Sequence, residues 1–332
     1  MDITSYVRNA ALAGTGIMAV YAAPYSLEQK VYADEPVASN PNPPDKKNAP
    51  AEKSLEEKVV DRINFYRNIA GLDPVVLDPE ISKACQAHAN YLMRNNIRSS
   101  THSLEEAHSE NPNSPGYTKE GAKMAKLSDI GYGKDPIEST NDAMKTFFHR
   151  ISYLDPRLGS VGIGYSSRFN KNKENKWTVT SFKKEAKKLL EIITAYPADK
   201  QTDVPLTYFH ERPDPIPEDQ DRIAGFPITL TFYDWNYPKG SQGTIKKLEY
   251  IKTKDETKLG KKEIPSWFSS PEKPASQEYQ GPTICLIPKD PLEHGTTYEL
   301  TVTGILNNQP WEKTWQFTTV KQEVSDSVQP PR

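Results

Sequence analysis

Two proline-rich stretches set the limits within which this chain can fold. Residues 34–53 hold five prolines among Asn, Asp and Lys, and residues 197–221 hold another five. Proline fixes φ and removes a backbone donor, so neither stretch is expected to continue a helix or a central strand. We therefore expect two linkers, a folded unit at 54–196, a second unit at 222–320 and a disordered tail at 321–332. The length of 332 residues agrees with two units, since single cores stop growing at about 250–300 residues.

The first 33 residues resemble an export signal. Arg8 precedes a small-residue apolar run from Ala10 to Ala23, which is shorter than the ~20 residues of a membrane span. Val20-Tyr21-Ala22 and Val31-Tyr32-Ala33 both fit a cleavage site, and the alternative interpretation of the run is a buried helix. The arrangement favours export of a protein whose residues 1–33 are the signal, to a secreted, periplasmic or cell-envelope location, with no integral membrane span after cleavage.

Charge and cysteine content exclude several classes of protein. The 42 basic and 44 acidic residues nearly balance, with a net charge of −2. No long basic run is present, so we expect no nucleic acid as a partner. Two cysteines cannot support a disulfide-stapled scaffold. Cys85 falls in a predicted helix and Cys285 in a predicted strand of the other unit, and we interpret both as buried free thiols.

Helical spacing dominates the beginning of the first unit. Ser54 and Glu57 form a capping-box pattern before apolar residues at helical spacing, and Gly71 ends the run. Asp78-Pro79 predicts the start of a second helix. The elements expected after it are a long ordered loop at 95–117, a third helix from about 140 to 148, strands at 161–165 and 177–182, a helix-like segment at 183–190, and residues 191–196 as an extension of either kind of element.

The hydrophobic period changes to two in the second unit. Apolar residues alternate with polar ones at 228–232 and 298–303, and Asn307-Asn308 predicts a turn before another strand. Several short alternating strands over about 100 residues predict a β-sandwich. Trp311 and Trp315 share one face of their strand, and we interpret them as packing residues rather than as a sugar-stacking pair.

Three separated segments of the first unit resemble one known family. They are Asn64 and Arg67 in an N-x-x-R pattern, Ala87-His88-Ala89, and Phe148-His149-Arg150 with Gly162-Ile163-Gly164. Their order resembles the CAP superfamily of cysteine-rich secretory, antigen 5 and plant pathogenesis-related proteins, and the last segment resembles its bacterial branch. The resemblance covers roughly residues 55–195. It implies a CAP-type α–β–α sandwich for the first unit. Together with the all-β sandwich predicted for the second unit, which we take to be a bacterial Ig-like domain, the expected fold class is α+β.

The resemblance also implies a central cleft where two histidines and two acidic residues can hold a divalent metal such as zinc. His149 matches the second family histidine. His108 is the first candidate for the other, and His102 is the alternative. The family's glutamate is replaced by Ala122, and the remaining acidic candidate is Glu120, one residue out of place. Asn64, Arg67 and Arg150 match structural positions of the family.

Every histidine also has a structural interpretation. His88 lies on the apolar face of its helix and is best explained as a packed core residue. His149 could bond the backbone of the 154–158 loop, and His108 could be a surface loop residue. His210 and His294 have no partners at a telling spacing. No G-x-S-x-G elbow, placed Cys–His pair or glycine-rich phosphate loop is present.

Three hypotheses of function follow. The first is an exported, non-catalytic binding module for a small apolar ligand, an envelope component or a protein partner, because the CAP motifs are present while the acidic set is depleted. The second is a divergent metal-assisted hydrolase with His108 and His149 as metal ligands and Glu120 as base. The third gives the main role to the Ig-like domain, as an adhesive or spacer unit.

Overall fold

The computed structural model describes residues 52–97, 102–170, 173–185, 192–217, 223–252 and 257–322. The predicted signal at 1–33, nearly all of the linker at 34–53, and residues 323–332 of the predicted tail lie outside these ranges. Residues 52–332 group as a single compact unit.

The first two helices begin where local sequence predicts. Helix α1 (Leu55–Ile69) is capped by Ser54, whose hydroxyl accepts the Glu57 N–H while the Glu57 carboxylate accepts the Ser54 N–H. Helix α2 (Pro79–Arg94) is capped by Asp78, which accepts two N–H groups of the first turn. Both caps satisfy donors that have no partner inside their helix, and the two predicted starts are therefore confirmed.

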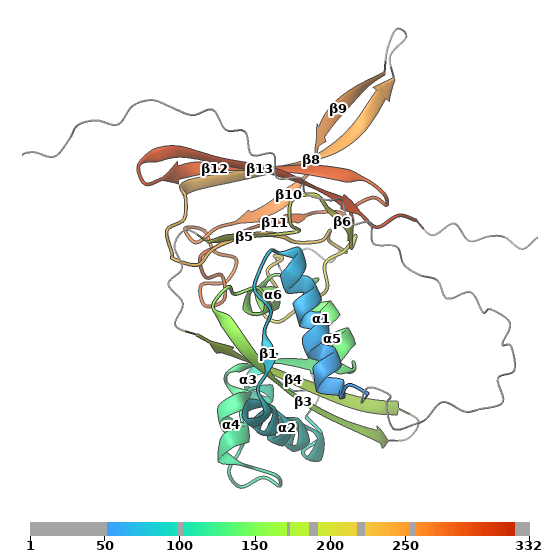
Figure 1. Cartoon of the computed structure of the whole chain (residues 1–332), viewed down its shortest axis with the longest axis vertical. Helices are drawn as coiled ribbons and strands as arrows, with labels where there is room; N and C mark the ends of the chain where they lie inside the picture. Colours follow the sequence, from blue (N-terminus) through green and yellow to red (C-terminus); the bar gives the residue numbers. More distant parts are fainter. Residues whose placement is uncertain are drawn as a thin grey trace, which may run out of the picture. The chain divides into compact units, whose positions relative to one another are not determined.

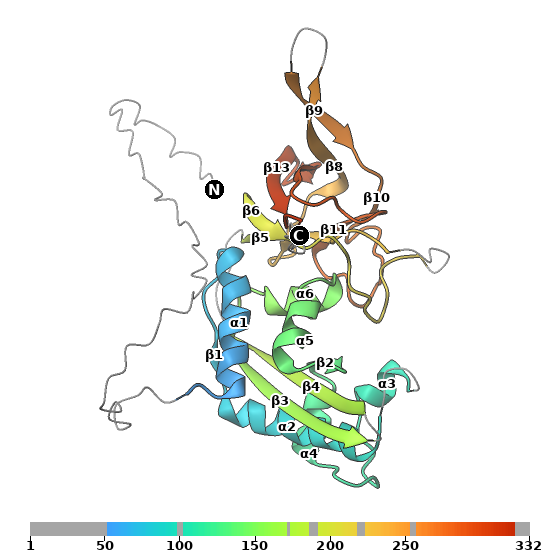
Figure 2. The same ribbon diagram turned by 90° about the vertical axis from the view of Figure 1, so that its right-hand side faces the viewer.

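A four-stranded sheet lies between two helical layers. Its order is β1 (Val76–Leu77), β3 (Leu158–Asn170), β4 (Lys173–Lys184) and β2 (Ser128–Tyr132). Helices α2 and α4 (Lys119–Ala125) cover one face, and α1 and α5 (Pro136–Ala143) cover the other (Figure 2). Close packing of α2 on β3 requires glycine, since a Cβ at Gly164 would lie 2.2 Å from the Cys85 backbone carbon.

The first unit differs from expectation in three places. The predicted loop at 95–117 contains a short helix, α3 (Leu104–Ala107). The predicted third helix is two helices, α5 and α6 (Phe148–Tyr153). The Thr146 hydroxyl donates to the Ala143 carbonyl at 2.6 Å, which helps to end α5 before α6 starts. The helix-like segment expected at 183–190 does not begin at 183, because β4 continues through Lys184, and residues 186–191 lie outside the described ranges.

The described C-terminal part of the chain contains two sheets (Figure 1). Apolar side chains of both sheets belong to one buried core. One sheet has the order β10 (Ser266–Ser269), β11 (Thr283–Pro288), β7 (Ile228–Phe232), β5 (Ile193–Tyr196). The other has the order β6 (Gln201–Val204), β13 (Gln309–Thr319), β12 (Thr297–Leu306), β8 (Lys239–Lys252), β9 (Thr257–Glu263). Trp315 is buried between them and donates from its indole N–H to the Pro197 carbonyl at 3.0 Å, whereas Trp311 is half-buried against Phe232.

The boundary expected at residue 196 lies inside this strand-rich part. Strand β5, expected at the end of the first unit, pairs antiparallel with β7, and β6, expected in a linker, pairs parallel with β13. Residues 205–217 of that proline-rich stretch also pack, because Tyr208 and Ile216 are buried. Proline excludes helices and central strands, but edge strands and packed side chains remain compatible with it. We call residues 205–217 the strap.

Two buried arginines hold the first unit together and join it to the sheets. Arg67 donates to the carbonyls of Asp73, Tyr153 and Asp155 at 2.8–2.9 Å. Arg150 donates to the Met144 and Pro227 carbonyls. The third matched position, Asn64, exchanges two hydrogen bonds with the backbone of Val75. The main apolar core accordingly continues from Val59 and Ile63 of α1 to Leu230 and Phe317 in the sheets.

Both cysteines are free and buried, as predicted. Burial raises the pKa of the Cys85 thiol to about 12. Among the described residues, no helix has the length and apolar character needed to cross a membrane.

Candidate functional site

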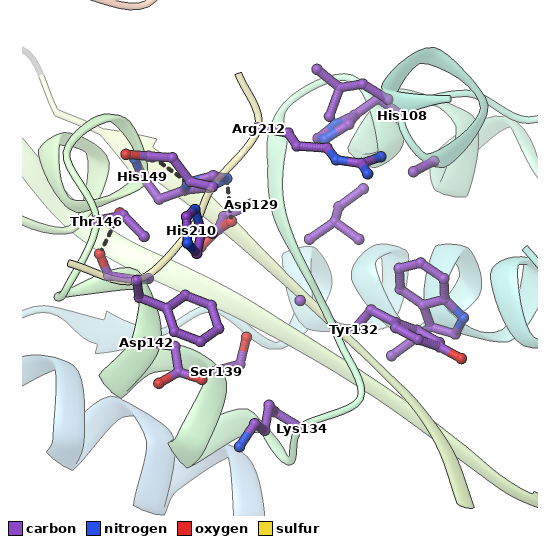
Figure 3. A pocket seen from close by; sticks show the side chains of 18 of the residues that line it. His108, Asp129, Tyr132, Lys134, Ser139, Asp142, Thr146, His149, His210 and Arg212 are labelled. Carbon is purple, nitrogen blue, oxygen red and sulfur yellow. Dashed lines mark hydrogen bonds and ion pairs between the residues drawn. The ribbon is translucent and has the colours of Figure 1, made fainter. Parts of the chain in front are cut away.

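A cavity of about 660 Å³ lies beside strand β2. Its walls come from α3 and the residues around it, from β2, from α5 and α6, and from the strap. Figure 3 shows His149, Asp129 and Thr146 on one side of this space and Tyr132 with His108 on the other. The cavity therefore gathers side chains from segments that are more than 100 residues apart in the sequence, from His102 to Asp214.

His149 lies between two carboxylates. Its Nδ1 is 2.7 Å from Glu211 Oε2, and its Nε2 is 3.5 Å from Asp129 Oδ1. The Glu211 side chain is 1% exposed and that of Asp129 is 10% exposed, whereas the His149 side chain keeps 27% of its surface accessible. The imidazole is thus the accessible member of a group whose charges are otherwise buried.

This environment changes the protonation of His149. Burial alone would lower the pKa of His149, but the charge of Asp129 and the hydrogen bond and charge of Glu211 outweigh it and raise the pKa to about 9. The ring therefore carries both protons at neutral pH. In that state both of its nitrogens are donors, and neither has a free lone pair.

Glu211 also holds the start of α6 in place. Its carboxylate accepts the backbone N–H groups of Phe147 at 2.6 Å, Phe148 at 3.0 Å and His149 at 3.2 Å. These are donors that the helix itself cannot satisfy, and a negative charge is favourable at that end of a helix. One strap side chain thus fixes both the backbone and the imidazole of His149.

Asp129 continues the polar chain on the other side. Its Oδ2 accepts the Tyr153 hydroxyl at 2.7 Å, and Tyr153 is buried. Burial, together with the charge of Asp129, raises the pKa of Tyr153, so this hydroxyl stays protonated. The resulting order of contacts is Glu211, His149, Asp129 and Tyr153.

The histidines expected around the cleft are found at the cavity, whereas the expected acid is not. His108 and His102 both line the cavity. His108 Nδ1 donates to the Ala125 carbonyl at 2.8 Å, and burial lowers the pKa of His108, so this ring is neutral. Glu120 is exposed on α4 and does not belong to the cavity wall. The carboxylates beside His149 are Asp129 and Glu211 instead.

His88 has the packing role that its position on α2 indicates. It is fully buried, with Nδ1 at 2.9 Å from Glu110 Oε1 and Nε2 at 2.9 Å from the Ala107 carbonyl. The second oxygen of Glu110 accepts the Thr118 N–H at 3.0 Å. This pair ties α2 to the segment that precedes α4, and it does not line the cavity.

The family of the first unit is identified by comparison with known proteins. Residues 60–182 match the family described as CAP, the cysteine-rich secretory protein family. This stretch is a CAP domain. Among curated proteins, none matches the chain.

Two solved structures show similarity to about two fifths of the chain. An extracellular SCP-domain protein of Bacillus anthracis is 16% identical, with a TM-score of 0.28, over 39% of this chain and 40% of that one. An outer surface protein of Borrelia burgdorferi is 12% identical, with a TM-score of 0.29, over 40% of this chain and 93% of that one. This chain therefore spans about two fifths of the length of the first of these structures.

The donors of this CAP domain do not fit the metal that the family resemblance implies. Both ring nitrogens of His149 are turned toward carboxylates, and His108 retains only Nε2 for a ligand. Within the described ranges, no group of three or more His, Cys, Asp or Glu side chains is arranged to hold a metal ion. A zinc site normally needs at least three protein ligands in their deprotonated form.

The two carboxylates are not among the site residues predicted from the sequence. Asp129 lies in a short strand that was not predicted, and Glu211 lies 62 residues after His149 in a stretch interpreted as a linker. The one local signal for Glu211 was the titratable run His210-Glu211-Arg212 within the proline-rich stretch. His210, for which no partner was expected, lines the cavity and pairs with Asp214 at 3.3 Å.

Proposed function

We propose that this protein is an exported binding module whose CAP-domain cavity holds a ligand without transforming it. The observation that carries the proposal is the pairing of both His149 ring nitrogens with carboxylates. A general base needs a free lone pair near neutral pH, and so does a metal ligand. The paired imidazolium of His149 has no free lone pair. The hydrolase hypothesis depends on His149 as a metal ligand and is therefore disfavoured.

The dimensions and walls of the cavity support ligand binding. Its volume of about 660 Å³ falls within the ~300–1,000 Å³ range of ligand pockets. Apolar side chains such as Phe209, 42% exposed, and Leu104, 37% exposed, stand beside polar ones at its walls. Exposed apolar groups at a concave site provide binding energy, and the polar groups provide orientation.

Export and the nature of the second unit belong to the same proposal. The small-residue apolar run and its cleavage motifs within residues 1–33 support a secreted, periplasmic or cell-envelope location. Two packed sheets whose strands are largely antiparallel support a bacterial Ig-like sandwich that presents the CAP domain or spaces it from a surface. The ligands that the proposal allows are a small apolar molecule, an envelope component or a segment of a protein partner.

A thermal-shift screen of the full chain against a library of small molecules and short peptides tests the binding role. We expect at least one compound to raise the melting temperature, because a ligand that binds only the folded state stabilises it. Ala107→Trp, which fills the cavity from α3, should abolish that shift. Glu105→Trp, on the same short helix but outside the cavity wall, should retain it.

The non-catalytic part has a separate test. Elemental analysis after mild purification should find no stoichiometric zinc, and the protein should cleave neither peptides nor nucleic acid. Stoichiometric zinc, or a hydrolytic activity that His149→Ala abolishes, would show that the proposal is wrong.

A further inference from the structure

We infer that the ligand of this cavity is an extended peptide segment that pairs with the free edge of β2 as a fifth strand of the sheet. This inference rests on the proposed function, since it names the chemical class of the ligand that the same cavity holds. It is carried by the position of β2, by the direction of its main-chain groups and by the space beside them.

Strand β2 is an edge strand that lies along the cavity. It pairs with β4 and, among the described residues, has no second neighbour in the sheet formed with β1, β3 and β4. Four consecutive residues, Asp129 to Tyr132, line the cavity. Because successive side chains of a strand point to opposite faces, a cavity over one face would be lined by alternate residues only. Consecutive lining means that the strand presents its edge to the cavity.

The labelled side chains agree with that orientation. Asp129 points toward His149, and Tyr132 points away from it to the opposite side of the space (Figure 3). Tyr132 packs on Trp177, with ring centroids 4.7 Å apart, on the face covered by α2. Gly131 lies on the other face, where a Cβ would collide with Ser139 of α5. The main chain between these two faces therefore borders the cavity.

The ladder with β4 shows which main-chain groups are free. The Gly133 N–H donates to the Lys176 carbonyl at 2.9 Å. In an antiparallel pair, hydrogen-bonded and non-hydrogen-bonded positions alternate. Asp129 and Gly131 therefore bond to β4, while Ile130 and Tyr132 direct their N–H and C=O groups away from it. Within the described part of the chain, these outward groups have no hydrogen-bonding partner.

An extended peptide is the ligand that these groups fit. A strand offers donors and acceptors at every second residue, a repeat of about 6.8 Å, which matches the spacing of the outward groups of Ile130 and Tyr132. Folded proteins usually cover a free edge with a loop or a helix. Here residues of α3 and of the strap line the cavity that borders the edge of β2. Leu104 and Phe209 are exposed at this cavity and would contact side chains of the bound peptide.

The test begins with random heptapeptides displayed on phage and selected on the full chain. A selected heptapeptide is then synthesised with a single N-methyl group at each position in turn. We expect N-methylation at alternate positions to weaken binding by at least about tenfold and the intervening positions to tolerate it, because only alternate N–H groups face β2. Two results would overturn the inference. One is a loss of affinity that does not alternate along the peptide, and the other is that every selected peptide still binds Ala107→Trp.

Two variants of β2 test the same pairing from the protein side. Ile130→Pro removes an N–H that the ladder with β4 does not use, and proline is tolerated at edge positions of that kind. It should weaken heptapeptide binding by at least about tenfold. Ile130→Ala loses the same apolar side chain and keeps the N–H, so it should lose far less affinity. Equal losses in the two variants would overturn the inference.

The outcomes separate the inference from the proposed function. If small molecules bind the native protein and fail to bind Ala107→Trp, while no heptapeptide shows the period-two pattern, the cavity is a binding site and the peptide inference is wrong. If neither small molecules nor peptides bind, both are wrong. Should Ile130→Pro fail to fold, the N-methyl series still decides, because it uses the unaltered protein.

Discussion

At the scale of single residues, the main polar feature of the cavity is one histidine that lies between two carboxylates. Asp129 comes from the edge strand and Glu211 from the strap, so His149 connects the CAP domain with the segment that follows it. The two carboxylates carry one more negative charge than the imidazolium neutralises. This makes the protonation of His149 a measurable indicator of whether the strap is in place.

We expect Glu211→Gln to lower the pKa of His149 from about 9 toward its ordinary value. The amide keeps an acceptor for the α6 N–H groups but loses the charge that favours the imidazolium. NMR titration of the His149 ring would measure the change. Glu120→Gln, exposed on α4, is the matched control and should leave the titration unchanged. A pKa that stays near 9 in Glu211→Gln would contradict the assigned role.

The raised pKa of His149 also predicts how stability depends on pH. The folded state holds the proton up to about pH 9, whereas an unfolded histidine releases it near pH 6.5. The stabilisation is therefore complete below about pH 6.5 and is lost as the pH rises to about 9, by an amount on the order of 3 kcal/mol.

Urea unfolding of the native protein and of His149→Gln across this interval would measure the effect. The unfolding free energy of the native protein should fall relative to that of the variant as the pH rises. Parallel profiles would show that His149 is not protonated more strongly in the folded state than in the unfolded one.

At the scale of elements, the glycines of Gly162-Ile163-Gly164 allow α2 to pack closely on β3. The Ser82 hydroxyl accepts the Ile163 N–H at 3.1 Å, and Gln86 exchanges two hydrogen bonds with the backbone of Tyr165. These contacts require the helix to lie directly on the strand. The glycines that resemble a family signature are thus explained by helix–sheet packing.

Gly164→Ala should destabilise the protein by roughly 2–3 kcal/mol, because its Cβ would lie 2.2 Å from the Cys85 backbone and α2 would have to move. Chemical denaturation would measure the loss. Ser167→Ala, exposed on the same strand, should have almost no effect. If Gly164→Ala proves neutral, the helix is free to shift and the packing explanation is wrong.

Elements whose causes are local were predictable from the sequence, and the site was predictable only in part. Ser54 and Asp78 cap helices through neighbours within three residues, so the pattern alone locates both starts. The family motifs led to His149 and His108, and both lie at the cavity. Glu211 and Asp129 act only through a fold that brings distant segments together. The titratable run His210-Glu211-Arg212 is the one local signal for Glu211, and no local pattern marks Asp129. The packing of the strap was not predicted either, because its proline content resembles that of a linker.

At the scale of the whole molecule, the CAP domain and the strand-rich part depend on each other. Strand β5 pairs in the second part although it follows the CAP domain directly, and the strap returns to the CAP domain through Glu211. Shared core residues on both sides require that the two parts form together. We therefore expect residues 52–322 to unfold in one cooperative transition.

Arg150 is the residue that best tests this dependence. Its guanidinium is fully buried, donates to the Pro227 carbonyl at 2.7 Å and lies 4.5 Å from the Phe226 ring centroid. Arg150→Met keeps apolar bulk but leaves the Met144 and Pro227 carbonyls without their donor, which should cost roughly 2–5 kcal/mol. In calorimetry the variant should show two transitions where the native protein shows one.

Arg168→Met is the matched control, since it makes the same substitution at an exposed position of β3. Substitutions at exposed positions usually change stability by no more than about 0.5 kcal/mol, so this variant should keep a single transition near the native temperature. Two transitions already present in the native protein would mean that the buried contacts of Arg150 do not couple the parts. In that case a fragment ending at residue 196 should melt like the intact CAP domain, whereas coupling predicts that it is markedly less stable because β5 would have no partner strand.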